Sequence, residues 1–168
     1  SGVCSTAEST EATITVDLNT IGGVLSASDS VCSGSNGATL SLSGYTGSIV
    51  QWEWSTDNWL NSNVIANITN THVYQNLTQD TKFKVIVSSG VCGAEESSEV
   101  QISMRPDLLV NLGNNIEFCI GDSVMLDAGH PGSSYLWNTL ESSQTIQVKS
   151  AGIFGVVVTD LNGCVASD

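Results

Sequence analysis

The five cysteines are the residues of this chain best suited to covalent chemistry: Cys4, Cys32, Cys92, Cys119 and Cys164. No two of them form a Cys-x-x-Cys pair and the chain has only 2 histidines, so a zinc site has little support. Their positions favour disulfides, Cys32 with Cys92 and Cys119 with Cys164, because each pair brackets one predicted module. Cys4 is then left unpaired, with a partner expected in a preceding module. Disulfides predict an oxidising compartment; five reduced, buried cysteines are the alternative.

The residues that could carry catalysis are few. A Ser/His/Asp arrangement needs a histidine held beside a nucleophile. His72 lies in a predicted strand and His130 in a Gly-His-Pro-Gly turn, and each is expected at the surface. The chain has no Gly-x-Ser-x-Gly motif and no phosphate-binding loop. Glu95 and Glu96 are adjacent in a polar hairpin, where we expect them to be solvated. The sequence therefore predicts no enzymatic activity.

Calcium is the best candidate among metals, because oxygen ligands are abundant. Asp160 and Asn162 form one partial ligand set and residues 17–19 (Asp-Leu-Asn) another, but neither resembles a full twelve-residue loop. Such residues more often shape turns through hydrogen bonds to the backbone. We therefore expect no metal or other cofactor, with calcium at Asp160 and Asn162 as a weak alternative.

A repeat organises the segments that carry these residues. Residues 1–16 match residues 89–104 without a gap, and both copies begin with Ser-Gly-Val-Cys. The Cys-x-Gly of residues 32–34 recurs at 119–121. The sequence predicts three parts: residues 1–18 as the terminal strand of a preceding repeat, 19–105 as a complete Ig-like module, and 106–168 as a second, shorter Ig-like module that lacks its last strand.

Alternation of apolar and polar residues predicts short strands throughout the chain, and no helical periodicity is present. The inward-facing residues that we expect are Val50, Trp52 and Trp54; Val73, Gln75 and Leu77; Phe83, Val85 and Val87; and Phe154, Val156 and Val158. Trp137 is expected in the core, and so is Trp59, although its loop would also let it contact a glycan. The predicted fold class is all-β, built from tandem Ig-like antiparallel β-sandwiches.

Charge and composition exclude several partners. The chain has 17 acidic and 4 basic residues, a net charge of −13, which would repel nucleic acid and disfavour anionic lipid. No apolar run reaches membrane-spanning length. The remaining surface is expected to be rich in Ser, Thr, Asn and Gly, as in extracellular β modules. We therefore expect no nucleic-acid partner, no direct membrane insertion and an extracellular location.

Much of the chain resembles a known family of repeats. Residues 119–128 (CIGDSVMLDA), 134–138 (SYLWN) and 162–164 (NGC) are similar to the Ig-like/PKD-like repeats of Bacteroidota cell-surface proteins, among them SprB-type gliding-motility adhesins exported by type IX secretion. Residues 31–34 (VCSG) and 52–57 (WEWSTD) also fit. The resemblance implies a cell-surface module without catalytic residues. Its expected partners are adjacent repeats of the same chain, and surface polysaccharide or another protein are candidates.

Two serines resemble acceptors for the O-glycosylation used in the same bacterial group. Ser30 and Ser123 each lie between an aspartate and a valine, which matches an Asp-Ser/Thr-aliphatic pattern. We predict glycans on both, although the two sites are not equivalent in the repeat.

These observations predict a non-catalytic repeat segment of a large cell-surface adhesin, acting as a spacer or binding module. One alternative is a subunit of a self-assembling extracellular filament, in which residues 11–16 of a neighbour supply the strand that residues 106–168 lack. A second alternative is an accessory module of a secreted enzyme.

Overall fold

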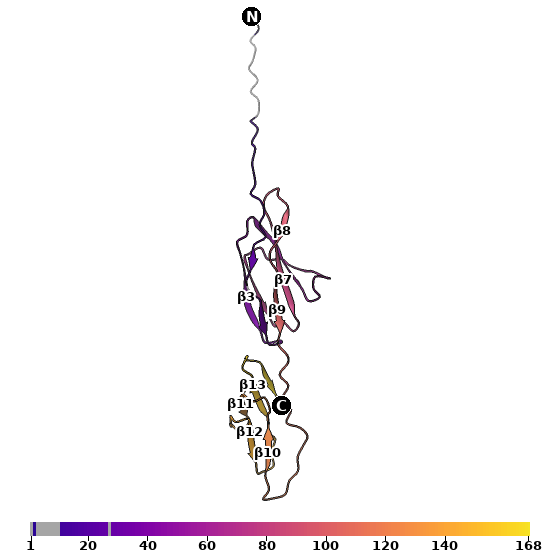
Figure 1. Ribbon diagram of the computed structural model, residues 1–168, viewed down its shortest axis with the longest axis vertical. Helices are drawn as coiled ribbons and strands as arrows, with labels where there is room; N and C mark the ends of the chain where they lie inside the picture. The colour runs from indigo at the N-terminus through magenta and orange to yellow at the C-terminus, as the bar shows by residue number, and fades with distance from the viewer. Residues whose placement is uncertain (1, 3–10, 27) are drawn as a thin grey trace. The chain divides into compact units, whose positions relative to one another are not determined.

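The structure is a computed structural model that describes residues 2, 11–26 and 28–168 (Figure 1). Cys4 lies outside the described residues. The described part is all-β, and it holds no helix long and apolar enough to cross a membrane. Its strands are β1 Val24–Leu25, β2 Asp29–Val31, β3 Gly37–Ser43, β4 Ser48–Ser55, β5 Asn63–Ile65, β6 Thr71–Gln75, β7 Thr81–Ser88, β8 Ala94–Glu96, β9 Val100–Met104, β10 Val124–Asp127, β11 Ser134–Trp137, β12 Thr145–Val148, β13 Val156–Thr159 and β14 Val165–Ser167.

The chain forms two compact units. The first unit comprises the described residues of Ser1–Ala27, Thr39–His72 and Lys82–Val100, and the second comprises Ser28–Ala38, Val73–Thr81 and Gln101–Asp168. These units are defined by contacts in space, whereas the boundaries at residues 18 and 105 were inferred from a sequence repeat and stay a prediction.

The strands form four sheets. Their orders are β1-β3-β6, β2-β9-β7-β4-β5 with β8 also paired to β7, β10-β12, and β11-β13-β14. β2 runs parallel to β9, with Asp29 opposite Ile102. The pairs β4–β7, β10–β12 and β11–β13 are antiparallel. The architecture is therefore a β-sandwich arrangement, as the sequence predicts.

In the first unit, the core lies under β7. Phe83, Val85 and Val87 are at most 3% exposed, and they alternate with half-buried residues, as the period of a strand requires. Trp52 on β4 lies opposite Val85 and is fully buried. Its indole N–H donates a hydrogen bond to the carbonyl of Thr69 at 2.9 Å, so the polar edge of the ring is satisfied. The predicted inward face of β7 is confirmed.

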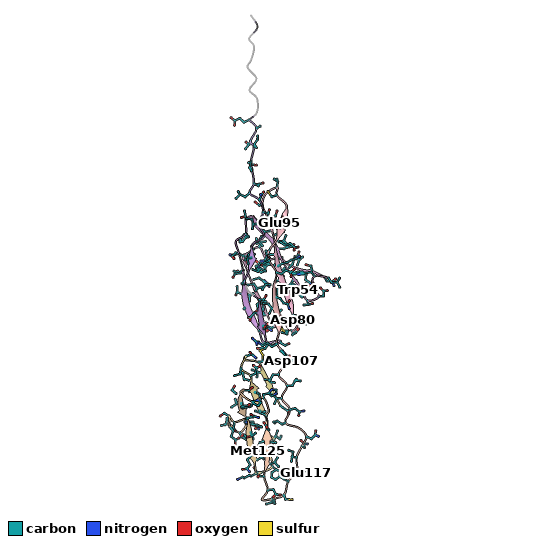
Figure 2. All side chains as sticks on the ribbon, in the orientation of Figure 1. Trp54, Asp80, Glu95, Asp107, Glu117 and Met125 are labelled. Atoms are coloured by element: carbon teal, nitrogen blue, oxygen red, sulfur yellow. A yellow bond between two sulfur atoms is a disulfide. The ribbon has the colours of Figure 1, made fainter. Side chains whose placement is uncertain are left out.

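The predicted inward face of β4 is wrong at Val50. The register between β4 and β7 shifts between Ile49 and Gln51, which marks a β-bulge. A bulge inserts an extra residue and reverses the alternation on one side of it. Ile49 is therefore buried and Val50 is 48% exposed. Trp54 is only partly buried on β4 (Figure 2).

The predicted inward face of β6 is also wrong, because the opposite set of side chains faces the core. Tyr74 is 4% exposed whereas Val73 is 60% exposed. His72 lies on the same face as Tyr74, and its ring is 5.5 Å from that of Trp52 and 5.8 Å from that of Phe83. The register that turns aromatic rings inward buries more apolar area than the one that buries valine. His72 is thus a partly buried residue and not the surface residue expected from sequence.

In the second unit, one apolar cluster joins the two small sheets. It contains Ala128, Trp137, Ile146, Val148, Val156 and Val158. Phe154 packs against it and is partly buried. Because these residues come from both β10–β12 and β11–β13, the two sheets pack face to face. A long connection without strands precedes β10 (Figure 1).

The last strand of the chain has a counterpart in the first unit. β14 pairs with β13, with Val165 opposite Thr159, as β8 pairs with β7, with Ala94 opposite Ser88. A cysteine turn precedes each of these short strands. β14 is therefore the counterpart of β8 and not of β9. That residues 106–168 lack a last strand stays a prediction.

Candidate structural site around Cys32 and Cys164

Cys32 and Cys164 form a disulfide in the second unit, with an S–S distance of 2.06 Å and a Cα–Cα distance of 5.4 Å. Cys92 and Cys119 are free thiols. The predicted pairs Cys32–Cys92 and Cys119–Cys164 are therefore wrong. A disulfide requires Cα atoms within about 7 Å, and the segment Ser28–Ala38 that carries Cys32 packs in the same unit as Cys164. Each cysteine forms a single disulfide, so this bond excludes both predicted pairs.

Asn36 fixes the turn that carries Cys32. Its side-chain amide donates hydrogen bonds to the carbonyls of Cys32 and Leu77, both at 2.7 Å. Its carbonyl oxygen accepts the backbone N–H of Leu77 at 2.9 Å. Gly34, whose φ of 72° suits glycine, also donates its N–H to the carbonyl of Leu77 at 2.8 Å. One amide side chain therefore holds the cysteine turn to a second segment of the same unit.

Asp160 shapes the turn that carries Cys164. Its Oδ1 accepts the backbone N–H groups of Asn162 and Cys164, at 2.8 and 2.9 Å. These bonds lower the pKa of the Asp160 carboxyl, and the bond from the backbone of Cys164 has the largest effect. Gly163 takes a φ of 81° within the turn. The sequence Asp-Leu-Asn-Gly-Cys thus folds as a turn closed by its own carboxylate, as its residue types indicate.

Arg105 bonds to both sides of the disulfide. Its backbone N–H donates to the carbonyl of Val31 at 2.8 Å and its Nε–H donates to the carbonyl of Ser30 at 3.0 Å. Its Nη1 donates to Oδ1 of Asn162 at 2.8 Å. The guanidinium therefore fastens the strand before Cys32 to the turn before Cys164. The sequence pattern did not predict this role for Arg105.

The same contacts bear on the calcium candidates. Asp160 and Asn162 lie together, but their oxygens are bonded to backbone amides and to the cationic side chain of Arg105. Among the described residues, no group of three or more His, Cys, Asp or Glu side chains could hold a metal ion. Calcium binding at this turn thus stays a prediction without a supporting contact.

The two histidines have structural partners. His72 lies between aromatic rings, and burial lowers the pKa of its imidazole. The Nε2 atom of His130 is 2.7 Å from the carbonyl oxygen of Leu109. His130 takes a φ of 52° in its turn. Each histidine therefore has a structural contact within the described residues.

A loop after β4 presents Trp59 to the outer face of β7. Asp57 accepts hydrogen bonds from the backbone and side-chain amides of Asn61, at 2.9 and 2.6 Å, and from the hydroxyl of Ser55 at 2.7 Å. These bonds lower the pKa of Asp57 to about 2, and the bond from the backbone of Asn61 has the largest effect. Ser55 in turn accepts the backbone N–H of Trp59 at 3.0 Å. The loop is therefore ordered by its own polar residues.

Lys84 on β7 covers the ring of Trp59. Its Nζ lies 4.5 Å from the ring centroid, 2.6 Å from Oε1 of Glu96 and 3.6 Å from Oε2 of Glu53. Burial opposes the charge on Lys84, but the hydrogen bonds and attraction of Glu96 and Glu53 outweigh it and raise the pKa of the ammonium. The buried indole N–H of Trp59 has no partner within hydrogen-bond geometry among the described residues, although its approach to Glu99 lowers the pKa of that carboxyl.

The second unit also has an apolar groove of about 890 Å³. The long connection before β10 contributes Ile116, Glu117 and Phe118 to its lining, and Glu117 is labelled in Figure 2. Leu126 and Phe154 also line it, as does Cys119, whose thiol is free and whose side chain is exposed.

Both predicted glycosylation serines are exposed. Ser30 lies on β2, and its carbonyl accepts the bond from Arg105. The hydroxyl of Ser123 accepts a hydrogen bond from the side chain of Gln147 at 2.9 Å. Exposure is compatible with modification, which stays a prediction.

Fold and site together define a disulfide-bonded β-sandwich module. The chain belongs to a family described as a domain of unknown function, DUF8696, whose model matches residues 21–106, just over half of the 168 residues. No curated protein matches the chain. Among solved structures, it is similar to the fibronectin(III)-like modules of Clostridium thermocellum CbhA, with 12% identity over 91% of this chain and 90% of that chain and a TM-score of 0.31. A TM-score this low carries no argument about function.

Proposed function

We propose that this chain is a non-catalytic, extracellular segment of a large cell-surface adhesin, in which its modules act as spacers or binding units. The observation that carries the proposal is the Cys32–Cys164 disulfide. Cytosolic thiols are kept reduced, and structural disulfides persist mainly in oxidising compartments. The same location suits small β-sandwich units whose cores are limited in size.

The charge distribution and the contacts of the polar residues also support this proposal. The chain has 17 acidic residues against 4 basic ones. Three of the basic residues, Lys82, Lys84 and Arg105, are engaged in hydrogen bonds to groups of the same chain. Little positive charge remains to bind phosphate or anionic lipid. Adjacent repeats of the same chain, surface polysaccharide or another protein are the partners that this surface suits.

The similarity of residues 119–128 and 162–164 to Bacteroidota surface repeats supports an adhesin of the gliding-motility, type IX secretion kind. In such a protein, repeated modules set the distance between the cell and the adhesive end. The tryptophans at the centre of each unit and the disulfide suit a module that keeps its shape outside the cell.

Antibody labelling of intact cells tests the proposed location. An antibody raised against the purified chain should bind intact cells that produce the protein, and external protease should remove the signal. Alkylation of the native protein before reduction should leave Cys32 and Cys164 unmodified. A signal found only after lysis, with both cysteines alkylated without reductant, would contradict the proposal.

A filament subunit is a second candidate, favoured by the exposed segment at residues 11–18. Ile14, Val16 and Leu18 are 90, 91 and 72% exposed, and residues 11–18 belong to no strand of the described structure. Ile14 aligns in the repeat with Ile102 on β9, which is 1% exposed. A strand with this pattern could join a sheet of a second copy of the chain.

Two matched variants test this candidate. The chain should form oligomers that grow with concentration, and Ile14→Asp with Val16→Asp should abolish them. Thr13→Asp with Thr15→Asp adds the same charge on the other face of the segment and should weaken assembly less. A monomeric mass for the unmodified chain at all concentrations, measured by sedimentation, would remove this candidate.

A further inference from the structure

The disulfide closes most of the chain into one covalent loop. Cys32 and Cys164 are separated by 132 positions, so 131 residues lie between them. The strands from β3 to β13 are inside this loop. Of the strands in the described residues, β1 and β2 precede it and β14 follows it.

We propose that the Cys32–Cys164 bond carries mechanical load past the strands inside the loop. Tension that enters the chain before Cys32 and leaves it after Cys164 follows the continuous covalent path. That path runs through the two sulfur atoms and not through the strands from β3 to β13. Forced unfolding follows the unfolding rate of the structure that is loaded. Tension on β2 and β14 reaches their partners β9 and β13 inside the loop and separates these pairs, but the residues between the two cysteines are not drawn out along the pulling direction while the bond is intact.

The contacts around the two cysteines suit this role. Asn36 bonds to the carbonyl of Cys32, and Asp160 bonds to the backbone N–H of Cys164. Arg105 bonds to the carbonyl of Ser30 and to the side chain of Asn162, on both sides of the disulfide. Load that arrives at either cysteine therefore meets a turn that is held by several hydrogen bonds within the same unit.

Chain dimensions give the size of the effect. A fully extended chain spans about 3.3–3.6 Å per residue, so the 131 residues between the cysteines would add roughly 450 Å if they were pulled out. With the bond intact, the corresponding Cα atoms stay 5.4 Å apart. The segment therefore keeps a nearly constant length under tension until a reductant opens the bond. This inference goes beyond the proposed location and does not depend on it, because the load path follows from the bond alone.

Single-molecule pulling on the full chain tests the proposal. The protein is held at its two termini, with Cys4, Cys92 and Cys119 changed to serine so that Cys32 and Cys164 are its only cysteines. The oxidised chain should extend only through the residues outside the loop. A phosphine reductant added under force converts the bond to two thiols and is itself oxidised, and it should release roughly 450 Å more.

Two further chains complete the test. In the same background, Cys32→Ser with Cys164→Ser should extend by the full length without reductant. The chain with all five cysteines should gain the same extension on reduction as the triple variant, roughly 450 Å. The proposal is overturned if the oxidised triple variant extends as far as the serine pair does. It is also overturned if the chain with all cysteines gains only about 200 Å of extension on reduction, which is the extended length of the segment that a Cys32–Cys92 bond would enclose. Reduction under force starts from folded protein, so the result stands even if the serine pair folds poorly.

Discussion

Trp137 donates its indole N–H to the carbonyl of Ser143 at 2.8 Å, from a side chain that is 1% exposed. Trp52 makes the equivalent bond to Thr69 at 2.9 Å in the first unit. Each unit therefore has a buried tryptophan whose large apolar ring fills the core and whose one polar atom is satisfied by the backbone. This shared device explains how two units of modest size each obtain a defined core.

Replacement of Trp137 by phenylalanine should lower the free energy of unfolding by about 2–4 kcal/mol. The change removes part of the ring and leaves the Ser143 carbonyl without its partner. Urea denaturation followed by circular dichroism measures the loss. Leu136→Thr is the matched control, because Leu136 is the preceding residue on the same strand, faces outward and is 56% exposed. If the two variants lose equal stability, Trp137 is not the centre of the core.

Stability should fall as pH is lowered through the range in which His72 titrates. Burial lowers the pKa of His72 below its ordinary value of 6.5, so the unfolded chain binds this proton more readily than the folded one. The associated stability is complete above the unfolded pKa and is lost as pH falls from there towards the folded pKa. His72→Phe keeps the ring contacts with Trp52 and Phe83 and removes the titration.

Chemical denaturation at a series of pH values measures this effect. The slope of stability against pH just below about 6.5 should be smaller in His72→Phe than in the unmodified chain. Asp57, whose pKa is lowered from 3.8 to about 2, contributes to the pH dependence only at lower pH. An unchanged slope in the variant would show that His72 is not the group responsible.

Removal of the Lys84 charge should destabilise the first unit by about 1–3 kcal/mol. In Lys84→Met, Glu53 loses its cation while its side chain is only 14% exposed. Glu96 contributes less, because its side chain is 60% exposed and its charge is screened by water. The double variant Lys84→Met with Glu53→Gln should recover part of the loss, which a double-mutant cycle measures. If Lys84→Met loses no stability, the interactions of Lys84 with Glu53 and Glu96 do not stabilise the first unit.

The loop that carries Trp59 should depend on Asp57. Asp57→Ala removes the acceptor of the Asn61 backbone N–H, so exchange of that amide with deuterium should accelerate. In the unmodified chain, protection should persist at about pH 4 and decline as pH falls towards 2, because the lowered pKa keeps Asp57 ionised until then. Amide exchange resolved by nuclear magnetic resonance tests both statements. Equal exchange rates at Asn61 in the two proteins would argue against this role.

Alternation in the sequence predicted the buried faces where the strands are regular. β7 and β13 bury the expected Val85, Val87, Val156 and Val158. It failed at Val50, because a bulge depends on the partner strand, and at Val73, because either face of β6 could supply apolar groups. Local patterning cannot distinguish such registers, since the choice is made by packing against other strands.

The sequence repeat did not predict which cysteines form the disulfide. Repeat positions showed where cysteine turns occur, but the partner of a cysteine is set by which turns meet in space. The contact of Lys84 with Trp59 was missed for a similar reason, because it joins a strand to a loop distant in sequence. The sequence shows a lysine on the outer face of a strand and a tryptophan in a polar loop, but nothing in either pattern indicates that the two side chains are in contact.

The most direct test of the account is peptide mapping of the native protein without reduction. The account predicts one cross-linked peptide pair that contains Cys32 and Cys164, with Cys92 and Cys119 recovered as free thiols. A cross-link of Cys32 to Cys92 or of Cys119 to Cys164 would contradict the account. Either result would also contradict the proposed load path and the arrangement of the second unit.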